Sequence, residues 1–361
     1  MNINIKKRIM ISSYDDIKNP FYAGGGSYII HKSAQELSKK FAVTVVTGKY
    51  PNSKNEVIDG IHYKRIGLAF GGPKVGQIAY QIALISEVKK DNYDTWIESF
   101  TPPFSTSFLP LFTKKPVVGL VHMLSAADMV RKYKLPFHLI ENFGLRQYKK
   151  FIVTQNQTKS EIHQQNRKAK IIVIPNGVEK IKTVPAVKKN ILFIGRIEVN
   201  QKGLDLLLNA YKKSRISQKL VIAGSGEKKQ ISILKSLIKD LKLQSKVALV
   251  GRVDSAKKQK LLSEAICIVV PSRFETFSLV CLESLNAGVP LVSFNIPGLK
   301  WIPNGYSIKI HPFDTEKLSV AISEVTKNSK THNAIAKKGQ MYAKKFSWEQ
   351  VGRSYIKALS I

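Results

Sequence analysis

Two glutamates, Glu275 and Glu283, lie in a segment whose pattern predicts a strand, a loop, a helix and a second strand (271–294, PSRFETFSLVCLESLNAGVPLVSF). Glu275 falls in the loop and Glu283 inside the helix, whose side chains lean toward its N-terminus, so both carboxylates can reach one pocket there. Free amides and the helix dipole suit a phosphate at this point, and the amides expected to serve are those of Phe277, Ser278 and Leu279. The glutamates are then placed to bind a sugar and a ribose. Taken singly, each reads as a surface glutamate.

A pair of cations lies in the segment 193–211 (FIGRIEVNQKGLDLLLNAY). Arg196 follows a strand expected to end at Gly195, and Lys202 with Gly203 stands at the start of the next helix. Because both cations come from one strand-to-helix turn, together they can neutralise a diphosphate. Two solvated surface cations are the alternative in so basic a chain.

Three consecutive glycines, at positions 24–26, precede a helix expected from Ser27 to Lys40. Glycine lets the backbone approach a phosphate or a sugar closely, which makes Gly25 and Gly26 candidates for ligand contact. The dinucleotide spacing G-x-G-x-x-G is absent, and a flexible turn is the alternative.

The elements that must position these residues alternate between strands and helices along the chain. Apolar runs predict strands in the first half at Arg8–Ser13, Ala42–Gly48, Tyr93–Ile97, Pro116–His122, Lys150–Thr154 and Lys170–Ile174. The second half predicts strands at Asn190–Gly195, Lys219–Gly224, Lys246–Gly251, Ala265–Val270 and Val289–Phe294. Helices are expected between them, including Leu204–Lys213, Gln230–Leu241 and Ser278–Asn286.

This alternation predicts an α/β protein with parallel sheets covered on both faces. A polar segment with no periodicity, at 177–189, marks the break between two doubly wound domains. We expect the domains at 1–180 and 181–345, facing each other across a cleft, with 346–361 as a C-terminal helix. Ligands bind beyond the carboxyl ends of the strands in such sheets, which would give the cleft two half-sites.

The composition limits the classes of protein. The net charge of +33, from 58 Lys+Arg against 25 Asp+Glu, favours polyanionic partners such as nucleic acid, anionic lipid or phosphorylated substrates, although a lysine-rich bias explains it equally well. Two cysteines in apolar runs, Cys267 and Cys281, argue against disulfides and fit a reducing compartment. Neither a signal peptide nor an apolar run long enough to span a membrane is visible. We therefore expect a cytoplasmic protein.

Taken together, the motifs resemble glycosyltransferase family 4, whose members are retaining enzymes of the GT-B architecture. The family's two glutamates separated by seven residues match Glu275 and Glu283. The resemblance also covers IPNGV (174–178), LFIGRIEVNQKGLDLLL, LVIAGSGE (220–227) and the N-terminal AGGGSYIIHKSAQEL. The final FSWEQVGRSYIKAL (346–359) resembles the family's closing helix, which crosses back to the first domain.

The resemblance implies a role for each candidate residue. It assigns Arg196 and Lys202 to the donor diphosphate and the leaving group, Glu275 to the transferred sugar, and Glu283 to the ribose hydroxyls. It further implies that His122 lies near the reacting sugar carbon. The remaining implied contacts are backbone amides from Phe277, Ser278 and Leu279, base contacts from Arg252 and Val253, and phosphate contacts from Gly25 and Gly26.

The sequence departs from the family pattern in two places. Thr276 and Ser278 stand where the family commonly has glycines, so their side chains can narrow the sugar pocket. The segment IPGLKWIPNGYSI also lacks an acidic residue that often follows the glycine turn.

These residues and the resemblance predict transfer of a sugar from a nucleotide-sugar, UDP-linked rather than GDP-linked, to a glycan acceptor attached to a lipid. No D-x-D pair indicates a metal site, so we expect neither metal nor cofactor, and two cations to replace the metal's charge. Retention is implied by the resemblance alone. The basic, partly apolar segment 131–150 could lie on an anionic membrane or form an ordinary surface helix.

Three alternatives remain open at this stage. Another GT-B activity, a phosphorylase or a sugar-nucleotide epimerase, would use a similar fold. A basic polyanion-binding protein would explain the charge, although no helix-turn-helix signature or zinc-ligand spacing indicates specific nucleic-acid binding. A catalytically inactive sugar-binding relative is disfavoured by the intact Glu275, Glu283, Arg196 and Lys202.

Overall fold

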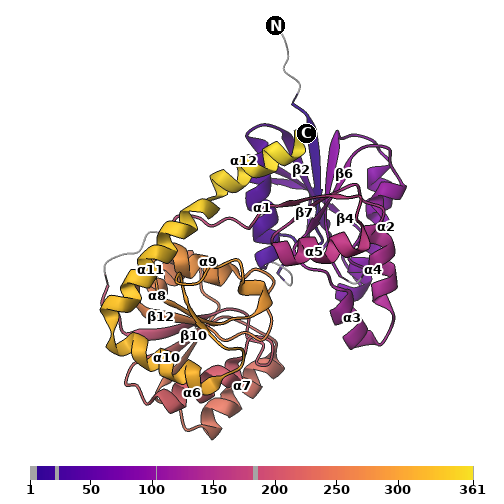
Figure 1. Ribbon diagram of the computed structural model, residues 1–361. Coiled ribbons are helices and arrows are strands. Elements are labelled where there is room, and N and C mark those ends of the chain that lie inside the picture. The colour runs from indigo at the N-terminus through magenta and orange to yellow at the C-terminus, as the bar shows by residue number, and fades with distance from the viewer. Residues whose placement is uncertain (1–5, 21–23, 103, 182–185, 361) are drawn as a thin grey trace. The chain divides into compact units, whose positions relative to one another are not determined.

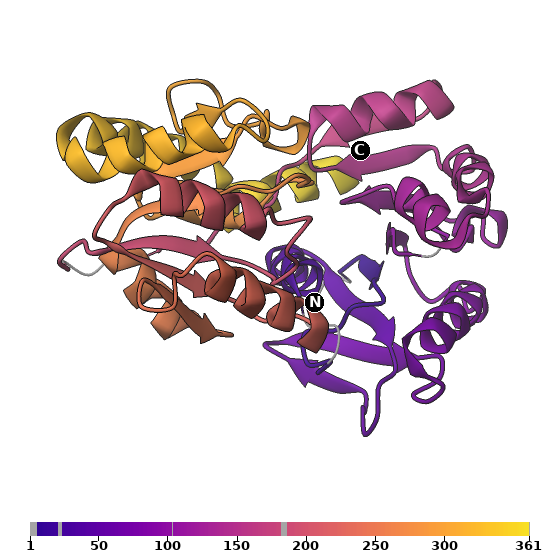
Figure 2. The same ribbon diagram turned by 90° about the horizontal axis from the view of Figure 1, so that it is seen from below.

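The computed structural model describes residues 6–20, 24–102, 104–181 and 186–360. The chain forms two compact units, the first made of Met1–Gly177 with Trp348–Ile361 and the second of Val178–Ser347 (Figures 1 and 2). Of the polar junction predicted at 177–189, residues 182–185 lie outside the described part.

The first unit is built on an eight-stranded sheet in the order β3-β4-β2-β1-β5-β6-β7-β8. All neighbouring strands are parallel except β3 and β4, which are antiparallel. The strands are β1 (Arg8–Ser12), β2 (Ala42–Gly48), β3 (Glu56–Ile58), β4 (Ile61–Ile66), β5 (Thr95–Ser99), β6 (Val117–Val121), β7 (Lys150–Val153) and β8 (Lys170–Val173).

The helices of the first unit connect these strands, except for the C-terminal helix. They are α1 (Gly25–Ser38), α2 (Gly72–Val88), the 3₁₀ turn η1 (Leu109–Leu111), α3 (Ala126–Tyr133), α4 (Phe137–Leu145), α5 (Asn156–Gln165) and α12 (Trp348–Leu359). The C-terminal α12, yellow in Figure 1, packs on α1 of this unit. A Cβ added at Gly352 would lie 2.5 Å from the Glu36 Cβ, so a glycine lets these two helices approach.

The second unit contains a six-stranded parallel sheet in the order β11-β10-β9-β12-β13-β14. Its strands are β9 (Asn190–Ile194), β10 (Lys219–Ala223), β11 (Val247–Gly251), β12 (Ala265–Val270), β13 (Leu291–Phe294) and β14 (Ile308–Ile310). Its helices, which lie on both sides of the sheet (Figure 2), are α6 (Leu204–Ser214), α7 (Lys228–Asp240), α8 (Ser255–Glu264), α9 (Leu279–Asn286), η2 (Pro297–Leu299), α10 (Thr315–Lys327), α11 (Ser329–Ala343) and η3 (Lys344–Phe346).

These two sheets confirm the predicted class of two doubly wound, Rossmann-like α/β units. Several boundaries differ for local reasons. β5 begins at Thr95 instead of Tyr93, because the Asp94 carboxylate accepts a hydrogen bond from the Arg8 amide at the strand start. β13 begins at Leu291 instead of Val289, because the Val289 amide still donates to the Ser284 carbonyl of α9. α1 begins at Gly25, so two of the predicted loop glycines belong to its first turn.

Both cysteines are buried free thiols, as expected from their apolar runs. Burial raises the pKa of Cys267 and of Cys281 to about 12, which keeps both thiols protonated and unreactive. Among the described residues, no helix combines the length and the apolar character that crossing a bilayer requires.

Candidate active site

The two predicted donor motifs of the second unit meet at the point where its strand order reverses. From β9 the chain runs outward to β10 and β11, then returns to the other side of β9 to form β12, β13 and β14. Arg196 and Lys202 follow β9, and Glu275 follows β12, its hydrogen-bonded neighbour. The carboxyl edge at such a switch point is where open α/β sheets bind ligands.

An ion pair joins these motifs across 73 positions of sequence. The Lys202 Nζ lies 2.8 Å from the Glu275 Oε1, and the Ser272 hydroxyl donates to the same oxygen over 2.7 Å. The Lys202 and Glu275 side chains are 18% and 10% exposed, so their mutual attraction is stronger than that of a solvated pair. The lysine ammonium retains donors for an anionic ligand, since it has three N–H groups.

Glycines bring the backbones of the two motifs together. Gly203 has a φ of +63°, and a Cβ at this position would lie 1.9 Å from the Pro271 carbonyl oxygen. On the other side of the loop, a Cβ at Gly298 of η2 would lie 1.8 Å from the Glu275 carbonyl oxygen. The loop that carries Glu275 is therefore held between two backbone segments that only glycine permits.

Two arginines, one in the turn that carries Lys202 and one in the loop that carries Glu275, form further polar contacts. The exposed Arg196 donates from its Nη2 to the Gln201 Oε1 over 2.7 Å, which holds its guanidinium beside the turn that carries Lys202. Arg273 forms a bidentate pair with Asp205 at 2.8 and 2.7 Å and also donates to the Asn200 carbonyl. Sequence reasoning did not single out Arg273, although its place between Ser272 and Glu275 was a signal.

Two stacked aromatic rings hold the start of α9 in place. Phe277 is buried and stacks on Trp301 with ring centroids 4.5 Å apart, while the Trp301 indole N–H donates to the Phe277 carbonyl over 2.6 Å. Ser278 is the N-cap residue, and its hydroxyl accepts a weak hydrogen bond from the Cys281 amide at 3.4 Å. The first amides of α9, beginning with Leu279, have no carbonyl partner within the helix and are suited to an anion.

Ser278 has a φ of +60° and a ψ of 92°, a backbone conformation that disfavours side chains. This geometry explains why the family commonly has glycine at this position.

Glu283 belongs to a second ion pair, with a lysine of α8. Its Oε1 lies 2.6 Å from the Lys258 Nζ of α8. α8 follows Arg252 and Val253 directly, and Asp254 caps its first turn by accepting from the Lys257 amide over 2.8 Å. Glu275 and Glu283 are thus each paired with a different lysine. Lys258 was not among the predicted residues.

In the first unit, Gly25 and Gly26 lie in the first turn of α1, which follows β1. β1 is the strand where this sheet reverses its order, because β2 and β4 lie on one side of it and β5 on the other. A Cβ at Gly26 would lie 3.0 Å from the Asp15 Oδ2. Burial raises the pKa of Asp15 to about 6, and this carboxyl is a further functional candidate that the sequence analysis did not identify.

His122 comes directly after β6, at the same edge of the first unit's sheet. Within the described part of the chain, neither its buried Nδ1 nor its buried Nε2 has a hydrogen-bond partner. Burial lowers the pKa of His122 to about 4, so the imidazole is neutral near pH 7. An unpaired buried imidazole is costly, which is typical of a group reserved for a ligand.

A buried carboxylate fixes the loop that follows His122. Glu141 of α4 accepts hydrogen bonds from the amides of Ser125 and Ala126 at 2.9 and 3.0 Å, and from the Ser105 hydroxyl. It thereby satisfies free amides at the start of α3. Glu141 was also not predicted, because nothing in its surrounding sequence indicates burial.

Metal-ligating side chains do not gather in the described ranges: no group of three His, Cys, Asp or Glu there could hold an ion. Metal independence itself stays a prediction.

Comparison with known proteins follows the same division of the chain. Residues 23–180 match the family described as Glycosyltransferase Family 4, and residues 175–341 match the one described as Glycosyl transferases group 1. An uncharacterised glycosyltransferase of Methanocaldococcus jannaschii is 32% identical over 182 residues, which is 48% of this chain and 45% of the relative. The chain spans about half the length of the curated relatives that it matches.

Two solved structures share the fold over nearly the whole chain. The sucrose-phosphate synthase from Thermosynechococcus elongatus has a TM-score of 0.84 at 20% identity, covering 98% of both chains. The Anabaena protein HepE, in a complex with UDP-glucose, has a TM-score of 0.78 at 17% identity, covering 98% of this chain and 99% of that one.

The two units share the GT-B architecture of these solved structures, and both family models that match the chain are glycosyltransferase models. Within that class, the two family matches cover residues 23–341 between them, and the chain resembles glycosyltransferase family 4, as the motifs indicated.

Proposed function

We propose that this protein is a retaining, metal-independent hexosyltransferase that moves a sugar from a UDP-sugar to a lipid-linked glycan. The observation that carries the proposal is the Lys202–Glu275 ion pair at the switch point of the second unit. It places a cation for phosphate and a carboxylate for sugar hydroxyls within one hydrogen bond of each other. A nucleotide-sugar carries a phosphate that can bind the lysine and hydroxyls that can bind the carboxylate. The ion pair lies at the edge of the sheet where ligands bind in this class of fold.

Departure of the nucleoside diphosphate develops negative charge on phosphate oxygens. Lys202, Arg196 and the first amides of α9 stabilise that charge, and they cost little reorganisation because their turn and helix are already held in place. Two cations and a helix N-terminus can replace the charge of a metal. Retention rests on the family resemblance. UDP is preferred as the carrier because a structural neighbour of the same fold has been solved with UDP-glucose.

The acceptor proposal rests on the surface formed by α3 and α4. The predicted amphipathic segment 131–150 covers the last residues of α3 and all of α4, which are separated at 134–136. Leu135, Leu139 and Phe143 are 57%, 60% and 54% exposed. The exposed cations of the same segment are Arg131, Lys132, Lys134, Arg146 and Lys149. Exposed apolar side chains and cations in one segment suit an anionic lipid surface, where a lipid-linked glycan would be presented.

The donor site is tested by measuring binding and turnover of the whole chain in the presence of a chelator. UDP, GDP and ADP and their glucose conjugates are compared by calorimetry, and slow hydrolysis of the bound sugar nucleotide gives turnover without an acceptor. We expect saturable binding of UDP, and Lys202→Ala should weaken it at least about tenfold, equivalent to about 1.4 kcal/mol. Glu275→Gln should retain UDP binding and lose sugar release.

Glu316→Gln is the matched control for the carboxylate. Glu316 also pairs with a lysine, Lys213, in the last turn of α6, the end away from Lys202. Equal activity of Glu275→Gln and Glu316→Gln would reject the assigned site. Phosphate-dependent sugar release without nucleotide binding would instead indicate a phosphorylase, and interconversion of sugar nucleotides without release would indicate an epimerase.

The membrane surface is tested with vesicles of phosphatidylglycerol and phosphatidylcholine. Binding should require the anionic lipid and fall when Leu139 and Phe143 are both replaced by serine, with donor hydrolysis unchanged. If this variant and the parent protein bind the vesicles equally, the net positive charge alone explains vesicle binding. The lipid-linked acceptor would then be removed from the proposal.

A further inference from the structure

The first unit contains a cavity of about 530 Å³, and none of the residues assigned to the donor site is among those that line it. Its floor includes Arg8, Ala42 and His62, which are the first residues of β1 and β2 and the second of β4. His122 and the glycines of α1 follow the opposite, carboxyl ends of their strands. The cavity and these residues of the first unit therefore lie at opposite edges of the same sheet.

The cavity exists because the described part of the chain leaves one face of three strands uncovered there. Met10, Thr44 and His62 are direct neighbours across β1, β2 and β4, and side chains two positions apart on a strand share a face. The alternating residues of the opposite face, such as Ile9 and Val43, are buried. A sheet with helices on both faces normally has apolar residues on both. Thr44 and His62 are polar, which marks this face as a surface that the described residues leave open.

The covering helix stops short of this surface. Tyr80 of α2 donates its hydroxyl hydrogen to the carbonyl of Val46, in the second half of β2, so the helix lies over the carboxyl part of the sheet. α2 ends at Val88, and its last turn forms one wall of the cavity through Glu87.

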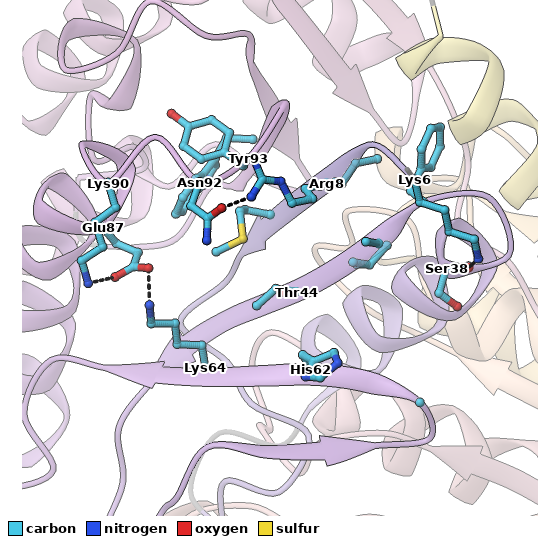
Figure 3. A pocket seen from close by; sticks show the side chains of 17 residues that line it. Lys6, Arg8, Ser38, Thr44, His62, Lys64, Glu87, Lys90, Asn92 and Tyr93 are labelled. Carbon is cyan, nitrogen blue, oxygen red and sulfur yellow. Dashed lines mark hydrogen bonds and ion pairs between the residues drawn. The ribbon is translucent and has the colours of Figure 1, made fainter. Parts of the chain in front are cut away.

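The lining is strongly basic. It contains four cationic side chains, Lys6, Arg8, Lys64 and Lys90, against the carboxylate of Glu87. Glu87 is already neutralised by both lysines of its wall, since it pairs with Lys64 and lies 2.7 Å from the Lys90 Nζ. In Figure 3 these three residues gather on one side, Lys6 lies on the other beside Ser38, and Arg8 lies between them, hydrogen-bonded to Asn92.

We propose that this cavity binds a small phosphorylated molecule, of sugar-phosphate to nucleotide size, independently of the donor site. Cations on both sides of a shared floor suit a phosphate group. Thr44 and His62 on that floor add hydrogen-bonding groups for hydroxyls, and the aromatic ring of Tyr93 lines the upper wall in Figure 3. The volume falls within the range of about 300–1,000 Å³ that is typical of small-molecule sites.

The proposal is tested by calorimetry on the full chain at physiological salt, with glucose 6-phosphate and inorganic phosphate as probes and glucose as the uncharged comparison. Arg8→Gln with Lys64→Gln removes two cations, and Thr44→Phe fills the floor while keeping every charge. The control, Lys235→Gln with Lys239→Gln, removes two exposed cations from α7. Circular dichroism verifies the fold of each variant.

We expect saturable binding of a phosphorylated probe but not of glucose. That binding should weaken at least about tenfold in Arg8→Gln/Lys64→Gln and in Thr44→Phe, and persist in the α7 control. UDP binding at the donor site should be unchanged in all three, which separates this outcome from failure of the proposed function.

Equal weakening in the α7 control would overturn the proposal, because the net charge alone would then explain binding. So would the absence of saturable binding by every soluble probe. Vesicles containing phosphatidylglycerol are tested in the same way. If the vesicles bind only when Arg8 and Lys64 are present, and soluble phosphates do not bind, the cavity is assigned to a lipid headgroup and its assignment to a small metabolite is overturned.

Discussion

Replacing His122 by phenylalanine should stabilise the first unit in acid. The imidazole is buried without a partner, and its pKa is lowered to about 4 from the ordinary value of 6.5. Between these two values the unfolded chain binds a proton that the folded chain does not, so the folded protein loses stability as the pH falls through this window. Above 6.5 both states are neutral, and no such loss exists.

The size of the effect follows from the displacement of the pKa. A change from 6.5 to 4, at about 1.36 kcal/mol for each unit, corresponds to about 3 kcal/mol of stability lost between neutral pH and pH 4. His122→Phe lacks this term. Its free energy of unfolding should therefore gain about 3 kcal/mol relative to the parent protein over the same range, while other titrating groups cancel in the difference.

The assay combines two readouts. NMR titration of the histidine Cε1 resonances gives the pKa directly, with the His122 signal identified by its loss in His122→Phe. Urea denaturation at several pH values gives the difference in unfolding free energy. His163→Phe, which removes an exposed imidazole from α5, controls for the substitution. A His122 resonance that titrates near 6.5 would refute the burial argument and the neutral imidazole inferred from it.

Three further substitutions probe the second unit. Gly203→Ala should destabilise it by about 3 kcal/mol in urea denaturation and abolish UDP binding, because the new Cβ meets the Pro271 carbonyl at a positive φ. Ser278→Gly should stabilise it by about 1 kcal/mol in the same assay, because glycine relieves the positive φ at the cost of one weak cap. Glu283→Gln should weaken UDP binding at least about tenfold by calorimetry, since a charged acceptor for ribose hydroxyls is lost.

Each of these has an outcome that contradicts it. Normal UDP affinity in Gly203→Ala would show that the turn and the Glu275 loop do not depend on each other. A less stable Ser278→Gly would mean that the serine cap outweighs the backbone strain. For Glu283→Gln, comparison with deoxy-UDP is decisive: if the variant and the parent protein discriminate the 2′-hydroxyl equally, Glu283 does not contact the ribose.

Much of the fold could be predicted because the strands are short apolar runs bounded by turns. β2 and β12 agree with the predicted ranges at both ends. α2 was not assigned, since Gly76 interrupts its helical pattern and its exposed face carries apolar residues such as Ile78 and Ile82. The β3–β4 hairpin was also missed, because β3 is only three residues long.

At the site, the types of residue were predictable but their partners were not. A motif indicates that Lys202 and Glu275 are available, whereas their pairing across 73 positions depends on how two loops pack. The same holds for Lys258 with Glu283 and for Arg273 with Asp205, whose contacts are made by long side chains from different elements.

The two glycines that pack closely against the Glu275 loop have a consequence for how such proteins diverge in evolution. The path of that loop is set by Gly203 and Gly298, which lie far from it in sequence, and not by the side chains that the loop itself displays. Residues such as Thr276 can therefore be exchanged during evolution without moving the backbone around a bound sugar. A lineage could change which sugar it selects by small steps within the loop, each compatible with a folded protein, while the two remote glycines stay invariant.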